Sequence, residues 1–285
     1  MTSKISFTNN IMSNVANESS GQQSANIHLT SKTEYKKIIS NGNYSDIVYY
    51  NEGAIHASDG FIFLIALHDA IIPVTWYVIS EYNNNNTLNY QIDADVFTFT
   101  IPDGNYSAYN IINLFNTSDI KLSNGITTSY NIINNKMTFT HTLIDFTILS
   151  TSTCLELIGL NEGVNSSSSS FILVCPNQVD LAGTREIYIK SNLHTINLDS
   201  RIGTITSSIL GKIPVVVESN NLIYYSNITQ NRSILKDRII SKIQITIEDD
   251  KGVPLDLTNH YSLTIEVQIT PNKFLVYEKS ITNGL

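Results

Sequence analysis

A strict two-residue alternation of isoleucine with polar residues constrains this chain more than any other sequence feature. In residues 242–248, isoleucine occupies positions 243, 245 and 247, so an extended chain has one apolar and one polar face. The turn-forming sequence Asp-Asp-Lys-Gly follows at 249–252, and residues 263–269 alternate in the same way. This pattern predicts two antiparallel strands in the C-terminal third, each with one buried face.

Strand signals recur along the rest of the chain. Residues 96–101 alternate, with Phe97, Phe99 and Ile101 on one face, while residues 61–67 and 213–217 are continuous apolar runs that suit the interior of a sandwich. Short strands at intervals of roughly 8–12 residues favour an antiparallel sandwich or barrel. Repeats at a fixed period are absent from the sequence, which argues against a propeller or solenoid.

The most apolar window, residues 61–80, has about the length of a membrane span. His68, Asp69 and Pro73 interrupt its middle. We therefore predict two core strands joined by a turn, and no insertion into a membrane.

Two short segments have helical signals. Residues 107–116 place apolar side chains on one helical face, and in residues 152–160 Thr153 and Glu156 have capping-box spacing, with Gly159 as a stop. Both are predicted to be short helices that connect strands.

Composition excludes several classes of protein. The 285 residues are 42% hydrophobic and 15% charged, enough to bury a large core, and 25 acidic against 17 basic residues give a net charge of −8. Such a chain is not expected to bind nucleic acid specifically. Cys154 and Cys175 form neither a disulfide framework nor a metal knuckle, so we expect buried thiols in a reducing compartment. Residues 1–45 contain no signal peptide, which favours cytosolic synthesis.

Charge is unevenly distributed along the chain. Residues 38–120 contain no Lys or Arg, whereas residues 184–242 contain eight basic and four acidic residues. One interpretation is a set of scattered, solvated loops; the other is a polarised subunit whose acidic side lies away from nucleic acid. The nine unopposed acids of the first window are Asp46, Glu52, Asp59, Asp69, Glu81, Asp93, Asp95, Asp103 and Asp119.

No catalytic motif is recognisable. The chain lacks the nucleophile elbow, the zinc-protease motif, the P-loop and the dinucleotide fingerprint. Among the histidines, only His68, beside Asp69, has a suggestive neighbour, and adjacent strand residues point to opposite faces, so the pair is predicted to mark a turn. We predict no catalytic, cofactor-binding or metal-binding residue, and no enzyme. The six histidines are His28, His56, His68, His141, His194 and His260.

Acidic and aromatic groups offer weaker candidates for a site. Glu248-Asp249-Asp250 suggests a cation loop but lacks the calcium spacing, so a hairpin tip is the preferred interpretation. Asp93-x-Asp95 precedes a strand and is an equally weak candidate for a cation site. The doublets Trp76-Tyr77 and Tyr224-Tyr225 are candidates for stacking on a sugar or a base, although such doublets usually divide between core and rim. A glycosidase-type carboxylate pair stays possible, because its members meet in space and not in sequence.

Several segments, taken in order, resemble the penton, or minor capsid, proteins of virophages and polinton-like viruses. They combine an apolar-Pro-x-x-Trp/Tyr stretch, a strand leading through Gly-Asn-Tyr into a helix, and a C-terminal series of strands and turns. The segments are residues 70–79 (AIIPVTWYVI), 97–106 (FTFTIPDGNY), 155–160, 179–184, 186–193, 209–215 (ILGKIPV), 223–225, 243–250 and 255–259.

This resemblance implies an all-β fold, a single jelly-roll antiparallel β-sandwich with short connecting helices. It further implies a structural, pentameric vertex protein of an icosahedral virion, assembled in the host cytoplasm as a homopentamer among trimers of a double-jelly-roll major capsid protein. Residues 45–270, which the resemblance covers, would form the jelly-roll domain, and the C-terminal tail (271–285) is left unassigned. Residues 1–44 are polar and without sustained periodicity, so we expect an N-terminal arm that folding does not need. The chain is long for eight strands, so extended loops or a small inserted sheet are expected.

Two rival functions stay open. The first is a lectin-like jelly roll that binds a receptor or carbohydrate, and the second is a β-sandwich hydrolase with two carboxylates. On the capsid interpretation, residues 38–120 would lie outside or against basic neighbours. Basic residues would lie nearer packaged DNA; they are Lys190, Lys212, Lys236 and Arg238.

Overall fold

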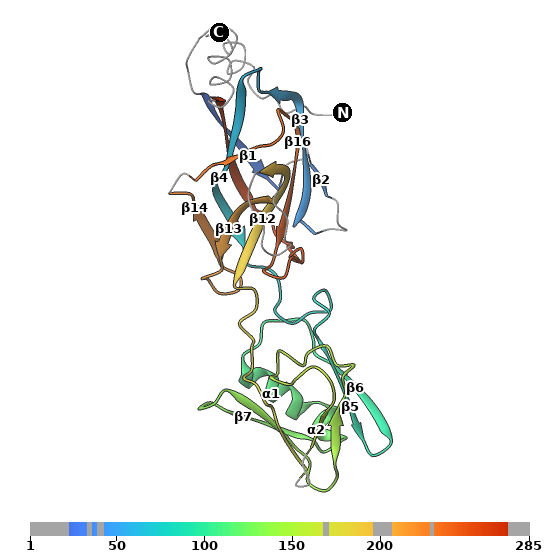
Figure 1. The fold of residues 1–285 in the computed structure, drawn as a ribbon. Coiled ribbons are helices and arrows are strands. Elements are labelled where there is room, and N and C mark those ends of the chain that lie inside the picture. Colours follow the sequence, from blue (N-terminus) through green and yellow to red (C-terminus); the bar gives the residue numbers. More distant parts are fainter. Residues whose placement is uncertain are drawn as a thin grey trace, which may run out of the picture. The chain divides into compact units, whose positions relative to one another are not determined.

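The chain folds into two compact units, one inserted into the other. The computed structural model describes residues 23–32, 36–38, 43–167, 171–195, 207–228 and 231–272. The first unit comprises the chain up to Trp76 and from Thr184 onward, and the second is Tyr77–Gly183 (Figure 1). Each unit has its own hydrophobic core.

Two antiparallel sheets form the first unit. One runs in the order β1-β17-β4-β14, with the short β15 also paired to β4, and the other runs β13-β12-β16-β3-β2. The strands of the first sheet are β1 (Gln23–Thr30), β17 (Ser262–Pro271), β4 (Phe61–Pro73), β14 (Leu222–Ser226) and β15 (Ser233–Ile234). Those of the second are β13 (Ser207–Pro214), β12 (Glu186–Thr195), β16 (Ile239–Glu248), β3 (Asp46–His56) and β2 (Lys36–Ile38).

The strand order is that of a jelly roll. Apart from β2 and β15, the described strands of this unit form nested pairs along the chain. The first strand, β1, pairs with the last, β17; the next pairs inward are β3 with β16, β4 with β14, and β12 with β13. These pairs make one antiparallel ribbon, and rolling it up brings β17 against β4 and β16 against β12. The predicted fold class, an all-β jelly-roll sandwich, is confirmed.

Alternating isoleucines build the core, as predicted. Ile243, Ile245 and Ile247 on β16 are buried, and they share one core with Leu263 and Ile265 of β17. Isoleucine and leucine on the facing sides of two sheets remove their apolar surface from water, which is the main stabilising term of such a sandwich.

The window 61–80 departs from the prediction of two strands and a turn. Residues 61–73 form the single strand β4. Opposite β17 the register shifts, since Thr264 pairs with Asp69 and Ile265 with Leu67, so His68 is the extra residue of a β-bulge. A bulge absorbs the two polar residues without ending the strand.

The apolar run 213–217 is also not the buried strand that we predicted. Strand β13 ends at Pro214, and only Ile213 of the run is buried. Val216 is 81% exposed. An apolar run does not reveal where its sheet ends.

The inserted unit contains two further antiparallel sheets and the two helices of the described chain. One sheet is ordered β10-β9-β5-β6 and the other β11-β8-β7. The strands are β10 (Asn165–Ser166), β9 (Phe146–Ile148), β5 (Thr87–Ile92), β6 (Asp95–Thr100), β11 (Ile172–Val174), β8 (Lys136–Thr140) and β7 (Thr127–Asn131). The helices are α1 (Ala108–Thr117) and α2 (Asp119–Leu122).

The prediction of a helix at 107–116 is confirmed by α1. Ser107 is its N-cap, accepting a hydrogen bond from the Asn110 N–H, and Ile111 and Phe115 are buried. No helix in the described part of the chain is long and apolar enough to cross a membrane.

The predicted helix at 152–160 is wrong, because this segment forms turns. The Thr153 hydroxyl accepts the N–H of Thr87 at 3.0 Å, so it binds strand β5 instead of capping a helix. Gly159 has a φ of +82°, and a Cβ atom added at this position would lie 2.5 Å from the Asn177 carbonyl oxygen. A helix signal of barely two turns is weak, and here tertiary hydrogen bonds override it.

The predicted boundary of the N-terminal arm is wrong for residues 23–30. They form β1, which pairs with β17 from Gln23–Ile269 to Thr30–Ser262. Ile27 and Leu29 are buried, so β1 contributes to the core. Residues 1–22 of the predicted arm and 273–285 of the predicted tail lie outside the described residues.

Candidate interaction surface

Three of the described histidines contact groups of the surrounding structure. His28 and His260 lie beside hydroxyl groups, with Nδ1 2.9 Å from Thr264 Oγ1 and 3.2 Å from Ser31 Oγ. His141 Nδ1 accepts two backbone N–H groups of its own loop. His56 is exposed, and the described structure does not extend to the side chain of His194.

The contact between Ser31 and His260 is a serine–histidine pair that sequence spacing did not reveal. Ser31 is 0% exposed. Its hydroxyl also accepts the Tyr261 N–H at 2.9 Å and donates to the Tyr261 carbonyl at 3.4 Å. A buried hydroxyl committed to the backbone fastens the end of β1 and is not available as a nucleophile.

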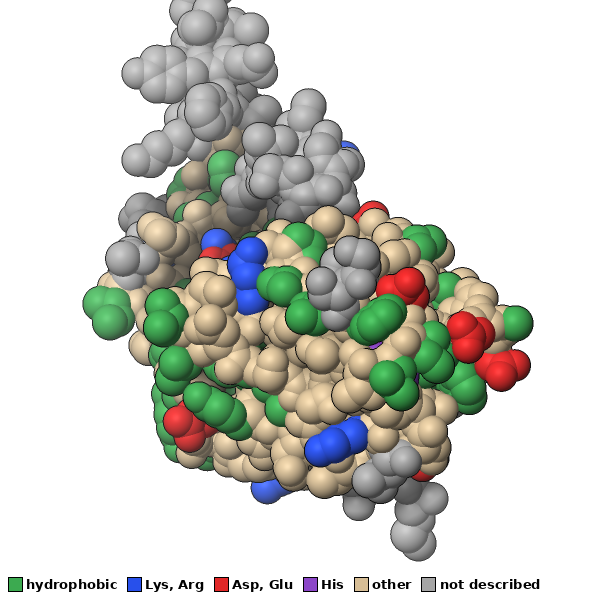
Figure 2. All heavy atoms as spheres, turned by 90° about the horizontal axis from the view of Figure 1, so that it is seen from below, with side chains coloured by type: hydrophobic (Ala, Val, Ile, Leu, Met, Phe, Trp, Pro, Cys, Tyr) green, Lys and Arg blue, Asp and Glu red, His purple; other side chains and the backbone are tan. Residues whose placement is uncertain are grey.

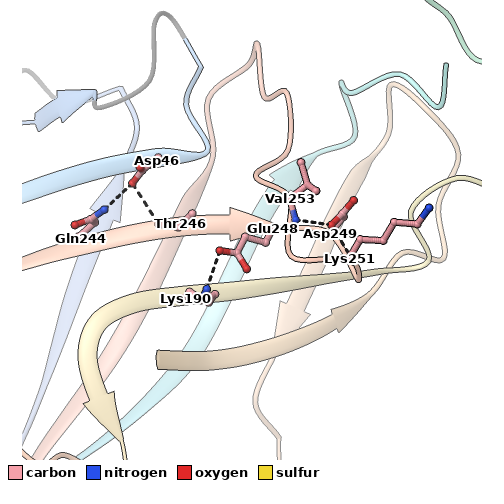
Figure 3. A network of polar contacts seen from close by, with 8 residues as sticks. All are labelled: Asp46, Lys190, Gln244, Thr246, Glu248, Asp249, Lys251 and Val253. Carbon is pink, nitrogen blue, oxygen red and sulfur yellow. Dashed lines mark hydrogen bonds and ion pairs between the residues drawn. The ribbon is translucent and has the colours of Figure 1, made fainter. Parts of the chain in front are cut away.

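The acidic segment at 248–250 is a hairpin tip, as preferred from the sequence. Glu248 accepts a 2.8 Å hydrogen bond from Lys190 Nζ, and Asp249 accepts the N–H groups of Lys251 and Val253 (Figure 3). Lone pairs used in this way are not free to bind a cation. Within the described ranges, no three His, Cys, Asp or Glu side chains converge on a possible metal position.

The polar row on β16 continues beyond the ion pair. Asp46 of β3 accepts hydrogen bonds from Gln244 and Thr246 at 2.9 and 3.2 Å (Figure 3). Asp93 and Asp95 lie at the exposed turn between β5 and β6, where Asp93 has a φ of +51°. Both groups of acids are thus accounted for by turns and cross-strand contacts.

Burial removes the two cysteines from solvent. Cys154 and Cys175 are 0% exposed in the core of the inserted unit. Burial raises the pKa of each thiol to about 12. The predicted burial of the two thiols is confirmed, and with these pKa values both are neutral at physiological pH.

Net charge is divided between the two units and does not follow the predicted window. The inserted unit, Tyr77–Gly183, contains nine acidic residues and two lysines, whereas the rest of the chain contains sixteen and fifteen. All nine carboxylates of the inserted unit are exposed. The face drawn in Figure 2 shows carboxylates scattered among uncharged groups, with no single acidic cluster.

Part of the positive charge of the basic-leaning stretch 184–242 is neutralised by nearby carboxylates. Several of its cations form ion pairs within the first unit, with N–O distances of 2.7–3.1 Å. These pairs are Lys190–Glu248, Lys212–Glu186, Arg232–Glu266 and Arg238–Asp59.

The two aromatic doublets divide between core and surface, as expected. Trp76 is buried in the core of the first unit, and Tyr77, which belongs to the inserted unit, is 45% exposed. Tyr225 packs against the core, while Tyr224 is 71% exposed.

An apolar hollow lies beside Tyr224 and is the candidate site of the first unit. Its volume is about 480 Å³. Besides Tyr224, the exposed apolar side chains here include Val216 (81%), Leu222 (42%) and Ile228 (89%). The lining residues are Ile213, Pro214, Val216, Val217, Leu222, Ile223, Tyr224, Tyr225, Ser226 and Ile228.

The position of the hollow follows from the jelly-roll topology. Among the described strands, β14 is the last strand of its sheet and β13 is the last of the other. The hollow is lined by β14, by the end of β13 and by the residues that follow β13. Exposed apolar side chains gathered along the outer strands of sheets are typical of a surface that another chain covers.

Similarity to known proteins is found among solved structures. No family model matches the sequence, and no curated protein matches it. Among solved structures, the chain is similar to the selenomethionine-labelled mavirus penton protein, with 12% identity and a TM-score of 0.46 over 87% of this chain and all of that one. The fold described above stands on the strand pairing alone.

Proposed function

We propose that this protein is a structural subunit of a virus shell, a minor capsid protein that forms the pentameric vertex. The observation that carries the proposal is the apolar hollow beside β13 and β14, the last described strands of the two sheets of a jelly roll. The order of sequence segments that resemble penton proteins supports the same function.

A ring of identical subunits suits such a hollow. In a cyclic ring each copy presents two different surfaces, one to each neighbour, and the ring closes when the rotation between copies is right. Val216 and Ile228, apolar side chains almost fully exposed in the isolated chain, would be covered by the neighbour. In the virion, a double-jelly-roll major capsid protein would surround the ring, and the acidic inserted unit would lie away from the genome, since carboxylates and phosphates repel each other.

Native mass spectrometry of the full-length chain tests the proposal. We expect a fivefold species, and we expect Val216→Glu to shift it toward monomer, because a carboxylate in an apolar interface loses its hydration. Ile133→Glu is the matched control, since Ile133 is 90% exposed on the inserted unit. A folded wild-type protein that stays monomeric or trimeric at high concentration would refute the pentamer.

A second candidate function rests on Tyr224. An exposed tyrosine beside an apolar hollow is also the arrangement with which a lectin-like jelly roll stacks on a sugar ring. Glycan-array binding that Tyr224→Ala abolishes and Ile133→Ala leaves intact would favour this function over the shell subunit.

A further inference from the structure

We propose that the hollow receives residues 274–277 of a second copy of this chain, which add as a strand to the outer edge of β14. The inference rests on the proposed function only in requiring that copies of the chain associate with one another. It assigns the contact between them to a named segment and a named edge.

The hollow follows the edge of β14 and does not lie on one face of it. Leu222 and Tyr224 point to the outer face of the sheet, and Ile223 and Tyr225 to the core side, yet all four line the hollow. A strand laid along this edge would therefore meet apolar side chains on both of its faces. The outer edge of β14 also offers backbone N–H and C=O groups, which strand addition uses.

Residues 274–277 have the matching composition. Their sequence is Phe-Leu-Val-Tyr, the longest uninterrupted apolar run outside the described residues. As a strand it would place Phe274 and Val276 on one face and Leu275 and Tyr277 on the other. Apolar residues on both faces are typical of a strand covered on both sides, and a strand with one face in water would alternate.

Chain length excludes the same copy as the donor. Strand β17 ends at Pro271, which pairs with Phe61 at the start of β4, whereas β14 pairs with Asp69–Pro73 at its other end. Eight to twelve residues of strand separate these positions, roughly 25–40 Å. Tyr277 follows Pro271 by six residues, which span at most about 20 Å. The segment that fits the hollow must therefore come from a neighbour.

Disulfide trapping in the full-length chain tests this inference. Tyr224→Cys and Val276→Cys are made in separate chains, which are mixed under mild oxidation, so a mixed disulfide forms only between copies. We expect at least about tenfold more mixed disulfide than for Ile133→Cys with Val276→Cys, because seating raises the effective thiol concentration toward the millimolar range. Cys154 and Cys175 are 0% exposed and do not compete. An excess of the free peptide Lys-Phe-Leu-Val-Tyr-Glu-Lys should suppress the product.

The outcomes separate this inference from the pentamer. Fivefold species without the mixed disulfide would overturn the seating of residues 274–277 and leave the ring intact. The mixed disulfide in an assembly of another size would support the seating and refute the pentamer. An internal disulfide in a chain that carries both substitutions, with no product between separate chains, would overturn the inference by showing that the tail reaches its own hollow.

Discussion

The ion pair between Lys190 and Glu248 should be far more sensitive to the loss of one partner than its exposed counterpart on the same sheet. The Glu248 side chain is 9% exposed and that of Lys190 is 25% exposed. Removing one partner of a fully buried pair costs about 3–5 kcal/mol, because the remaining charge is left without compensation. Lys190 is partly hydrated, so we expect Lys190→Met to lower the free energy of unfolding by about 2 kcal/mol.

A double-mutant cycle measured by urea unfolding checks this value. The double variant Lys190→Met/Glu248→Leu should regain most of the loss, since neither charge then remains buried. The control is Lys212→Met, which breaks a pair with Glu186 whose side chains are 53% and 36% exposed, and it should change the unfolding midpoint little. If Lys190→Met behaves like Lys212→Met, or if the double variant is as unstable as the single one, the reasoning is refuted.

Three further predictions concern the cores. Gly211→Ala should lower the free energy of unfolding by about 1–3 kcal/mol in urea melts, because the new Cβ would lie 2.6 Å from Leu67 Cδ2, and a compensating Leu67→Ala should not add its full cost. Cys154 and Cys175 should react with Ellman's reagent at pH 8 only after unfolding; fast reaction of the folded chain would contradict their burial. Burial raises the pKa of Tyr49 from 10.0 to about 12. The folded state therefore keeps the Tyr49 proton to a higher pH than the unfolded state does. The free energy of unfolding should fall by roughly 2–3 kcal/mol between pH 10 and 12. An equal pH dependence of the Tyr49→Phe variant would argue against this.

Sequence reasoning identified the fold where one face of a strand is buried. A two-residue alternation such as that of residues 242–248 indicates which side of the strand faces the core. The strands predicted from this pattern are present. The strand pairing itself could not be predicted, because β1 and β17 are more than 230 residues apart and their contact leaves no local signal. The arm boundary was misplaced for the same reason.

The remaining errors come from tertiary context that overrides local patterns. A β-bulge at His68 let a strand pass two polar residues, and hydrogen bonds to β5 replaced the cap that Thr153 was expected to form. The division of Tyr224 and Tyr225 between surface and core was predictable from alternation. The hollow was not, because it depends on where two sheets end in space.

The two separate cores have a consequence for how such a protein can change over generations. The buried residues of the inserted unit fall between Ile79 and Cys175, and none of them belongs to the core of the jelly roll. The insertion occupies one connection, between β4 and β12, a kind of position where domain insertions are well tolerated. Evolution could therefore replace or reshape the inserted unit while the strands of the jelly roll keep their sequence.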